Sequence, residues 1–360
     1  MEQLSKKVKY CLEMMDTIKW FSYWMPNDYL SRIFARMFFV YLDSYLDLIS
    51  RLKNMIRKEG IDVKQEHSEI LRLNKMYEEF FSVIRDKVGA HRQDMEFVEL
   101  IEKWNDLTNM TIKQFFVISE SIYSSLANKQ QSFMTYTRPV ELCATNKKLL
   151  IEYTKSLNKQ IPVIAVDNLA LTRPNTATII PTHELQTRGT MLISIIEMIE
   201  IEICLYHKFK EINNRFERLL KSMIIVDLFS IIDNLWGSDK TKYKPEIKGY
   251  YKVCEEIQHK GFHILHKTLL QRNILLENYI KIARNKYAAH IDTKNTIEKL
   301  FKLTDRIKID FIIKIFIPLK ESFNQANKLD IRTKILLIHG NELKGVHEVK
   351  GTGSIKKYKP

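Results

Sequence analysis

The chain has 360 residues, of which 45% are apolar and 28% charged, a composition typical of a folded globular protein and not of a disordered one. It contains 10 glycines and 8 prolines, which disfavours a loop-rich all-β fold, and its length allows two domains of ordinary size. A formal net charge of +14 and a pI near 9.3 attract polyanions, so nucleic acid is a natural partner, although base-composition bias also produces Lys-rich chains.

The first 130 residues have the apolar periodicity of long helices. Apolar side chains recur at intervals of three and four over segments near 2–22, 27–58, 67–90 and 95–127. Helix-breaking groups separate these segments, at Pro26-Asn27-Asp28, Gly60 and Arg92-Gln93-Asp94. The pattern predicts a helical bundle over 1–130. The N-terminus lacks the apolar core of a signal peptide and no apolar stretch is long enough to span a membrane, so we expect a cytoplasmic protein with no membrane partner.

A connector separates this region from a second helical one. The segment IPVIAVDNLALTRPNTATIIPTHE contains Pro162, Pro174 and Pro181, which lack an amide donor and interrupt any long helix. We therefore expect a connector over 131–186, extended for most of its length. Helical periodicity resumes near 187–210, 211–236, 247–258, 263–290 and 294–327. A basic extension over 328–360 follows, in which IRTKILLIHGNE is either a short strand or the end of a helix.

One short phrase occurs twice in the chain. RDKVGAH, from Arg85 to His91, returns as RNKYAAH, from Arg284 to His290, and 284 − 85 and 290 − 91 both give 199. A second match lies earlier in each region, where MFFVYLDSYLD, beginning at Met37, resembles MIIVDLFSIID, beginning at Met223, with an offset of 186. The second match consists mainly of apolar residues and is weak evidence for a repeat when taken alone. Because both matches come in the same order, they favour tandem copies of one domain, over 1–130 and 187–327.

The repeated residue types suit phosphoryl chemistry. A histidine exchanges its proton near neutral pH, and an arginine presents a fixed fork of donors to phosphate oxygens. In RNA the 2′-hydroxyl can attack its own phosphate if a base removes its proton, an acid protonates the leaving oxygen and a cation stabilises the added charge. One histidine cannot be base and acid in the same step. Two copies facing each other across a pseudo-twofold axis would supply both.

The repeated pattern resembles the motif of the HEPN superfamily, in which an arginine, a polar residue, four variable positions and a histidine follow one another in a domain of four or five helices. This resemblance implies an all-α protein in which two tandem HEPN-like bundles form an intramolecular pseudo-dimer. It implies catalytic roles for Arg85, His91, Arg284 and His290, with Asp86 and Asn285 as supporting polar residues. Active members of the family are endoribonucleases that need no metal or cofactor and line one cleft with both motifs.

The same resemblance implies single-stranded, loop or tRNA substrates and, by family analogy, a role in antiviral defence or growth arrest. An antitoxin, inhibitor or activator protein, or a second copy of the chain, would be compatible partners. Two alternatives stay open at this point. A module that binds RNA or a nucleotide without cutting would keep the basic cleft, and a helical interaction or scaffold protein would have no affinity for RNA.

Other polar residues have competing interpretations. Asp47 and Asp233 end the aligned helices and either orient a motif residue or are solvated acids, whereas Asp43 and Asp227 do not align with each other. Four scattered cysteines indicate a reducing compartment. A zinc site is an alternative near the last of them, but Gly261 interrupts the helical spacing, so we expect no metal. The residues concerned are Cys254, His259, His263 and His266.

Overall fold

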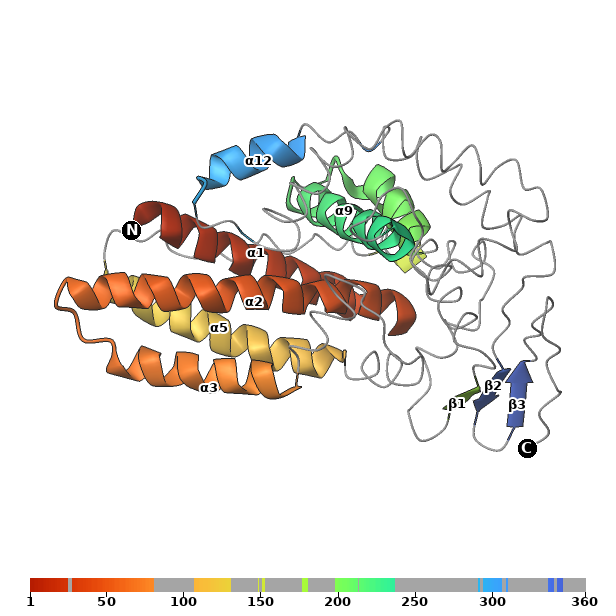
Figure 1. The fold of residues 1–360 in the computed structure, drawn as a ribbon, viewed down its shortest axis with the longest axis horizontal. Helices are drawn as coiled ribbons and strands as arrows, with labels where there is room; N and C mark the ends of the chain where they lie inside the picture. The colour runs from red at the N-terminus through yellow and green to blue at the C-terminus, as the bar shows by residue number, and fades with distance from the viewer. Residues whose placement is uncertain are drawn as a thin grey trace.

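The computed structural model describes residues 1–24, 28–80, 107–130, 148, 151–152, 177–180, 198–212, 214–236, 291, 294–305, 309, 336–339 and 342–345. These residues are mostly helical, as the sequence predicts (Figure 1). The helices are α1 (Glu2–Trp24), α2 (Asp28–Lys58), α3 (Lys64–Phe80), α5 (Asn109–Lys129), α9 (Asn214–Trp236) and α12 (Ile297–Asp305), with a further helical segment at 198–209. None of the described helices is long and apolar enough to cross a membrane.

Helices α1 and α2 form the centre of the first bundle. They are joined by residues 25–27, where Pro26 is predicted to break the helix, and they pack against each other (Figure 1). Every side chain of α2 from 33 to 42 is buried, which is the pattern of a helix covered on all sides. This part of α2 therefore lies inside the molecule, whereas the last two turns of the helix have exposed side chains.

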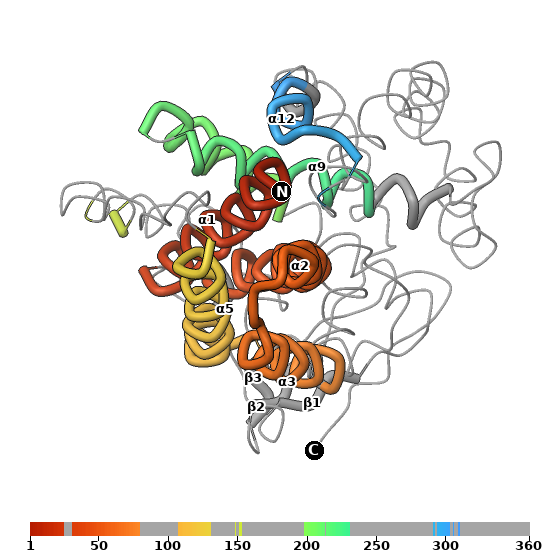
Figure 2. The backbone as a smooth tube through the Cα atoms, turned by 90° about the vertical axis from the view of Figure 1, so that its left-hand side faces the viewer, coloured from red at the N-terminus to blue at the C-terminus, as the bar shows by residue number. Residues whose placement is uncertain are grey.

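Helices α3 and α5 cover one side of this pair (Figure 2). The chain leaves α2 through Gly60, whose φ of +82° favours glycine, and Asp62 Oδ1 then accepts a hydrogen bond of 3.1 Å from the amide of Lys64 at the start of α3. At the other end of this layer Thr108 caps α5 by accepting from the amide of Thr111. These local signals fix where the helices begin and end.

Helix α9, the segment 198–209 and α12 lie on the opposite side of α1 (Figures 1 and 2). The buried apolar side chains of all these helices form one continuous cluster, so the first bundle and the later helices share a core. Aromatic contacts join the two parts, with the rings of Phe21 and Phe216 4.7 Å apart and those of Trp20 and Phe216 5.9 Å apart.

The structure also contains a three-stranded antiparallel sheet, which the all-α prediction does not include. It has the order β1 (Ala177–Ile180), β2 (Leu336–His339), β3 (Glu342–Gly345). Ala177 pairs with His339 and Ile180 with Leu336, and an irregularity between Leu337 and Ile338 shifts the register of β2 against β3. The strand alternative for IRTKILLIHGNE is thus confirmed. The sheet ties the expected connector to the C-terminal extension.

Candidate functional site

The six motif residues lie outside the described residues: Arg85, Asp86, His91, Arg284, Asn285 and His290. The described chain stops at Phe80, five residues before the first motif. After a later gap, over 237–290, it is described again at Ile291, directly after the second motif. The described residues nearest to the motifs along the sequence are therefore Phe80, at the end of α3, and Ile291.

Two further sequence candidates lie on described helices. Asp47 is on the outside of α2, where its Oδ1 accepts a hydrogen bond of 3.0 Å from Nε of Arg51, and both side chains are more than half exposed. Such an exposed pair one helical turn apart contributes little to stability. Asp233 belongs to α9, but its side chain is outside the described set.

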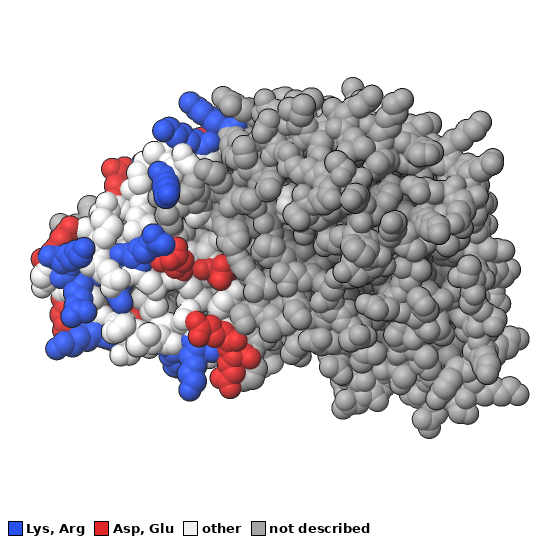
Figure 3. All heavy atoms as spheres, in the orientation of Figure 1, with Lys and Arg blue, Asp and Glu red and all other residues white. Residues whose placement is uncertain are grey.

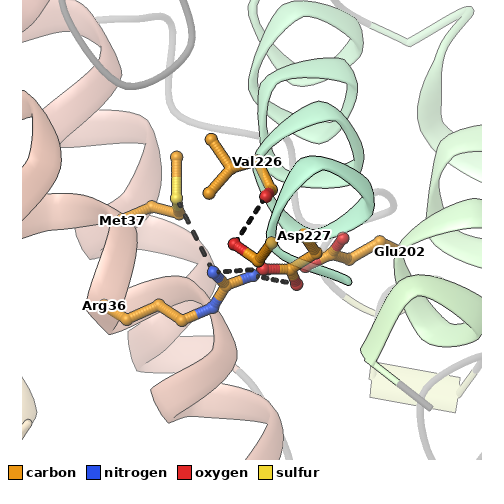
Figure 4. Close-up of polar contacts among 6 residues, drawn as sticks. Arg36, Met37, Glu202, Val226 and Asp227 are labelled. Atoms are coloured by element: carbon orange, nitrogen blue, oxygen red, sulfur yellow. Dashed lines mark hydrogen bonds and ion pairs between the residues drawn. The ribbon is translucent and has the colours of Figure 1, made fainter. Parts of the chain in front are cut away.

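A buried cluster of one arginine and two carboxylates joins α2 to the later helices. Figure 4 shows the Arg36 guanidinium directed at Asp227 of α9 and at Glu202 of the segment 198–209. Its Nη1 donates to Asp227 Oδ1 at 2.9 Å, and its Nη2 donates to Asp227 Oδ2 and Glu202 Oε1, each at 2.6 Å. All three side chains are fully buried. The two-pronged contact with Asp227 fixes distance and orientation together.

The cluster is expected to set the register between helices more than to add net stability. Removing ionised groups from water is costly, and their attraction in the interior approximately offsets that cost. Removing only one member, however, leaves an uncompensated buried charge. Arg36 therefore holds α2, α9 and the segment 198–209 in one relative position. The sequence signal was a charge inside an apolar run, IFARMFFV for Arg36 and IIVDLF for Asp227.

Helices α2 and α9 have the same burial pattern at the offset of 186 found in the sequence. Their first residues, Asp28 and Asn214, are themselves 186 positions apart. Burial agrees at every position from 32 to 44: partial at 32 and 218, complete through 33–42 and 219–228, partial at 43 and 229, and complete at 44 and 230. One residue earlier it differs, because Ser31 is buried and its counterpart Glu217 is partly exposed. Within that range each helix thus has the same all-round burial in its own surroundings.

Residues of different types occupy the positions equivalent to the ion pair of α2 and α9. Arg36 of α2 binds Asp227 of α9, and the positions equivalent to them at the offset of 186 are Ser222 and Tyr41. Burial raises the pKa of the Tyr41 hydroxyl to about 12, while the nearby Ser222 and Tyr10 side chains oppose the increase, and the Ser222 hydroxyl donates to the Arg218 carbonyl at 2.9 Å. The Arg36–Asp227 ion pair thus joins α2 to α9 at positions that are not equivalent.

The chain directly after the second motif is bound to α2. The amide nitrogen of Ile291 donates to Oγ of Ser44 at 3.3 Å, and both residues are buried. Ser44 follows Arg36 by two helical turns, so it lies on the same stripe of α2. The serine at its equivalent position, Ser230, is also buried. Sequence reasoning missed Ser44 because an isolated serine in an amphipathic helix carries no signal of its own.

Helix α12, which follows the second motif, also packs on α1 and α9. The Phe301 ring packs edge-on against Tyr10 of α1, with 5.2 Å between ring centres, and the Arg218 guanidinium lies 3.7 Å from the Phe301 ring centre. Lys6 Nζ lies 3.9 Å from a carboxylate oxygen of Glu298. The segment that follows the second motif is thereby packed on helices of both regions.

Acidic and basic side chains are mixed on the described surface. Figure 3 shows blue and red groups side by side, and the exposed residues near the end of α2 include both Asp47 and Glu59 and Arg51 and Arg57. The described part of this face is therefore not a continuous basic patch. Where the chain is described, no group of three His, Cys, Asp or Glu side chains could hold a metal ion. The four residues of the zinc alternative are not among the described ones.

Comparison with known proteins gives no relative, since no family model, no curated protein and no solved structure matches this chain.

Proposed function

We propose that the protein is a metal-independent endoribonuclease of the HEPN type, with one composite site formed by the motifs of two tandem helical copies. The repeated Arg and His motif supports the chemistry. The structural observation that supports the arrangement is the buried link between α2 and α9, the two helices matched at the offset of 186, in which Arg36 binds Asp227. The defence or growth-arrest role is part of the same proposal and rests on family analogy alone.

In the proposed arrangement a pseudo-twofold axis between α2 and α9 relates equivalent parts of the two copies. Each motif follows its buried helix in the same order along the chain, so the axis between α2 and α9 would relate the motifs as well. The hydrogen bond from Ile291 to Ser44 adds that the chain beside the second motif reaches the helix of the first copy. Both observations favour motifs that converge on the interface.

The proposed reaction cleaves RNA by transesterification at a backbone phosphate. One histidine removes the proton of the 2′-hydroxyl, and the 2′-oxygen attacks the adjacent phosphorus. The bond from phosphorus to the 5′-oxygen breaks, and the other histidine protonates that oxygen. Arg85 and Arg284 stabilise the negative charge of the five-coordinate transition state. The products are a 2′,3′-cyclic phosphate and a 5′-hydroxyl, and no water is consumed in the cleavage step.

The test is cleavage of total RNA and of tRNA by purified protein in EDTA. We expect wild-type protein to leave cyclic-phosphate ends, and His91→Ala or His290→Ala each to abolish cutting because one proton transfer is lost. His207→Ala, an exposed histidine beside α9, is the matched control and should cut normally. Binding without cutting in low salt would favour the non-catalytic RNA module instead. Neither binding nor cutting would favour the scaffold alternative.

A further inference from the structure

Ser44 has a contact that a purely local role does not explain. A buried serine in a helix can satisfy its hydroxyl within the helix, as Ser230 does by donating to the Val226 carbonyl at 2.8 Å. Ser44 Oγ instead accepts from the amide of Ile291, 247 residues along the chain. The contact joins the helix of the first copy to the second.

The bonded donor is part of the peptide unit that follows His290. The amide nitrogen of Ile291 is covalently attached to the carbonyl carbon of His290, about 1.33 Å away, and the peptide group is planar. A hydrogen bond to that nitrogen therefore limits the position of the backbone that carries the His290 side chain. Ile291 is itself 5% exposed, so the apolar core holds the other side of the same residue.

We propose that Ser44 is a positioning residue for His290, holding the histidine of the second copy against α2 of the first. This inference rests on the proposed function, since it assigns His290 a proton to transfer. Ser44 touches neither substrate nor the reacting atoms. Its effect on the reaction passes through the Ile291 peptide, and its role is to keep one half of the composite site aligned with the other.

The expected consequence is a change in turnover and not in substrate binding. Ser44→Ala removes the hydroxyl that accepts the hydrogen bond and leaves the buried Ile291 amide without this acceptor. The backbone at Ile291 can then shift. A displacement of about 1 Å in a reacting group can reduce a rate by roughly 10²-fold. We expect kcat to fall by about 10- to 100-fold at nearly constant KM. Ser44→Thr keeps the hydroxyl and should restore most of the rate.

Two readouts test the inference, one of them independent of catalysis. The first is hydrogen exchange of the Ile291 amide, followed in peptides that cover the residue. Ser44→Ala should speed its exchange, and Ser44→Thr should not. The second is the split between kcat and KM on a tRNA substrate. Ser119→Ala is the matched control, because Ser119 is fully buried and its hydroxyl donates within α5, to the Phe115 carbonyl. It should change neither readout.

The outcomes separate this inference from the proposed function. If wild-type protein cuts RNA and Ser44→Ala cuts with the same kcat, Ser44 is not a positioning residue and the proposed function stands. If exchange at Ile291 is unchanged by Ser44→Ala, the anchor itself is refuted. If wild-type protein does not cut RNA at all while Ser44→Ala still frees the Ile291 amide, the anchor stands and the ribonuclease proposal fails.

Discussion

Replacing Arg36 with methionine should destabilise the protein strongly. The change removes three charge-assisted hydrogen bonds, of 2.6, 2.6 and 2.9 Å, and leaves the fully buried Asp227 and Glu202 without their shared cation. Breaking a buried ion pair from one side costs about 3–5 kcal/mol, a large part of the roughly 5–15 kcal/mol that stabilises an ordinary domain. The matched control is Arg51→Met, because Arg51 pairs with Asp47 at the exposed surface. That change should cost below about 0.5 kcal/mol.

Urea denaturation, followed by circular dichroism, measures these differences. A combined variant, Arg36→Met with Glu202→Leu and Asp227→Leu, removes every charge of the cluster and should regain more than half of the loss, since no carboxylate is then buried alone. This variant keeps the test informative if Arg36→Met alone does not fold. A loss below 1 kcal/mol for Arg36→Met, or a combined variant less stable than the single one, would refute the reasoning about desolvated charge.

Three further results are expected. Burial raises the pKa of Tyr41 to about 12, above the value near 10 of an unfolded chain, so its contribution to stability is present below pH 10 and is lost between pH 10 and 12. In urea denaturation at alkaline pH, Tyr41→Phe should reduce this loss of stability by about 3 kcal/mol. Equal pH dependence of the two proteins would contradict the prediction. Lys129→Met removes hydrogen bonds of 2.8 Å to the buried Glu66 and to the Asp62 carbonyl, and should lower the free energy of unfolding by about 1–3 kcal/mol. An unchanged melting temperature would show that these bonds add nothing to stability. Binding to tRNA should weaken steeply between 50 and 200 mM salt in filter-binding assays, and a flat response would argue against phosphate contacts.

Helix positions were largely predictable because their signals are local. The expected segment 27–58 is found as α2 (Asp28–Lys58), since Pro26 and Gly60 mark its two ends in the sequence. The expected 211–236 is found as α9 (Asn214–Trp236). The sheet was harder to predict, because its strands have four residues each and β1 pairs with a strand far along the chain. Four residues are too few to establish a periodicity.

The buried cluster could not be predicted from alignment of the copies. Asp227 stood out little, because its equivalent position holds Tyr41 and not another acid. The ion pair joins positions of α2 and α9 that are not equivalent, so a search for matched residues does not find it. The partners of Arg36 lie 166 and 191 residues away, and only the packing of the helices brings them together. The motif residues themselves remain a prediction from the sequence.

The most direct test of a composite site within one chain is to mix two inactive variants. His91→Ala and His290→Ala proteins are assayed for tRNA cleavage separately and then together at equal concentration. If the two motifs of one chain form the site, each variant is inactive and the mixture stays inactive. Recovery of cleavage in the mixture would show that motifs of different chains complete the site, and full activity in either variant alone would contradict a composite site altogether.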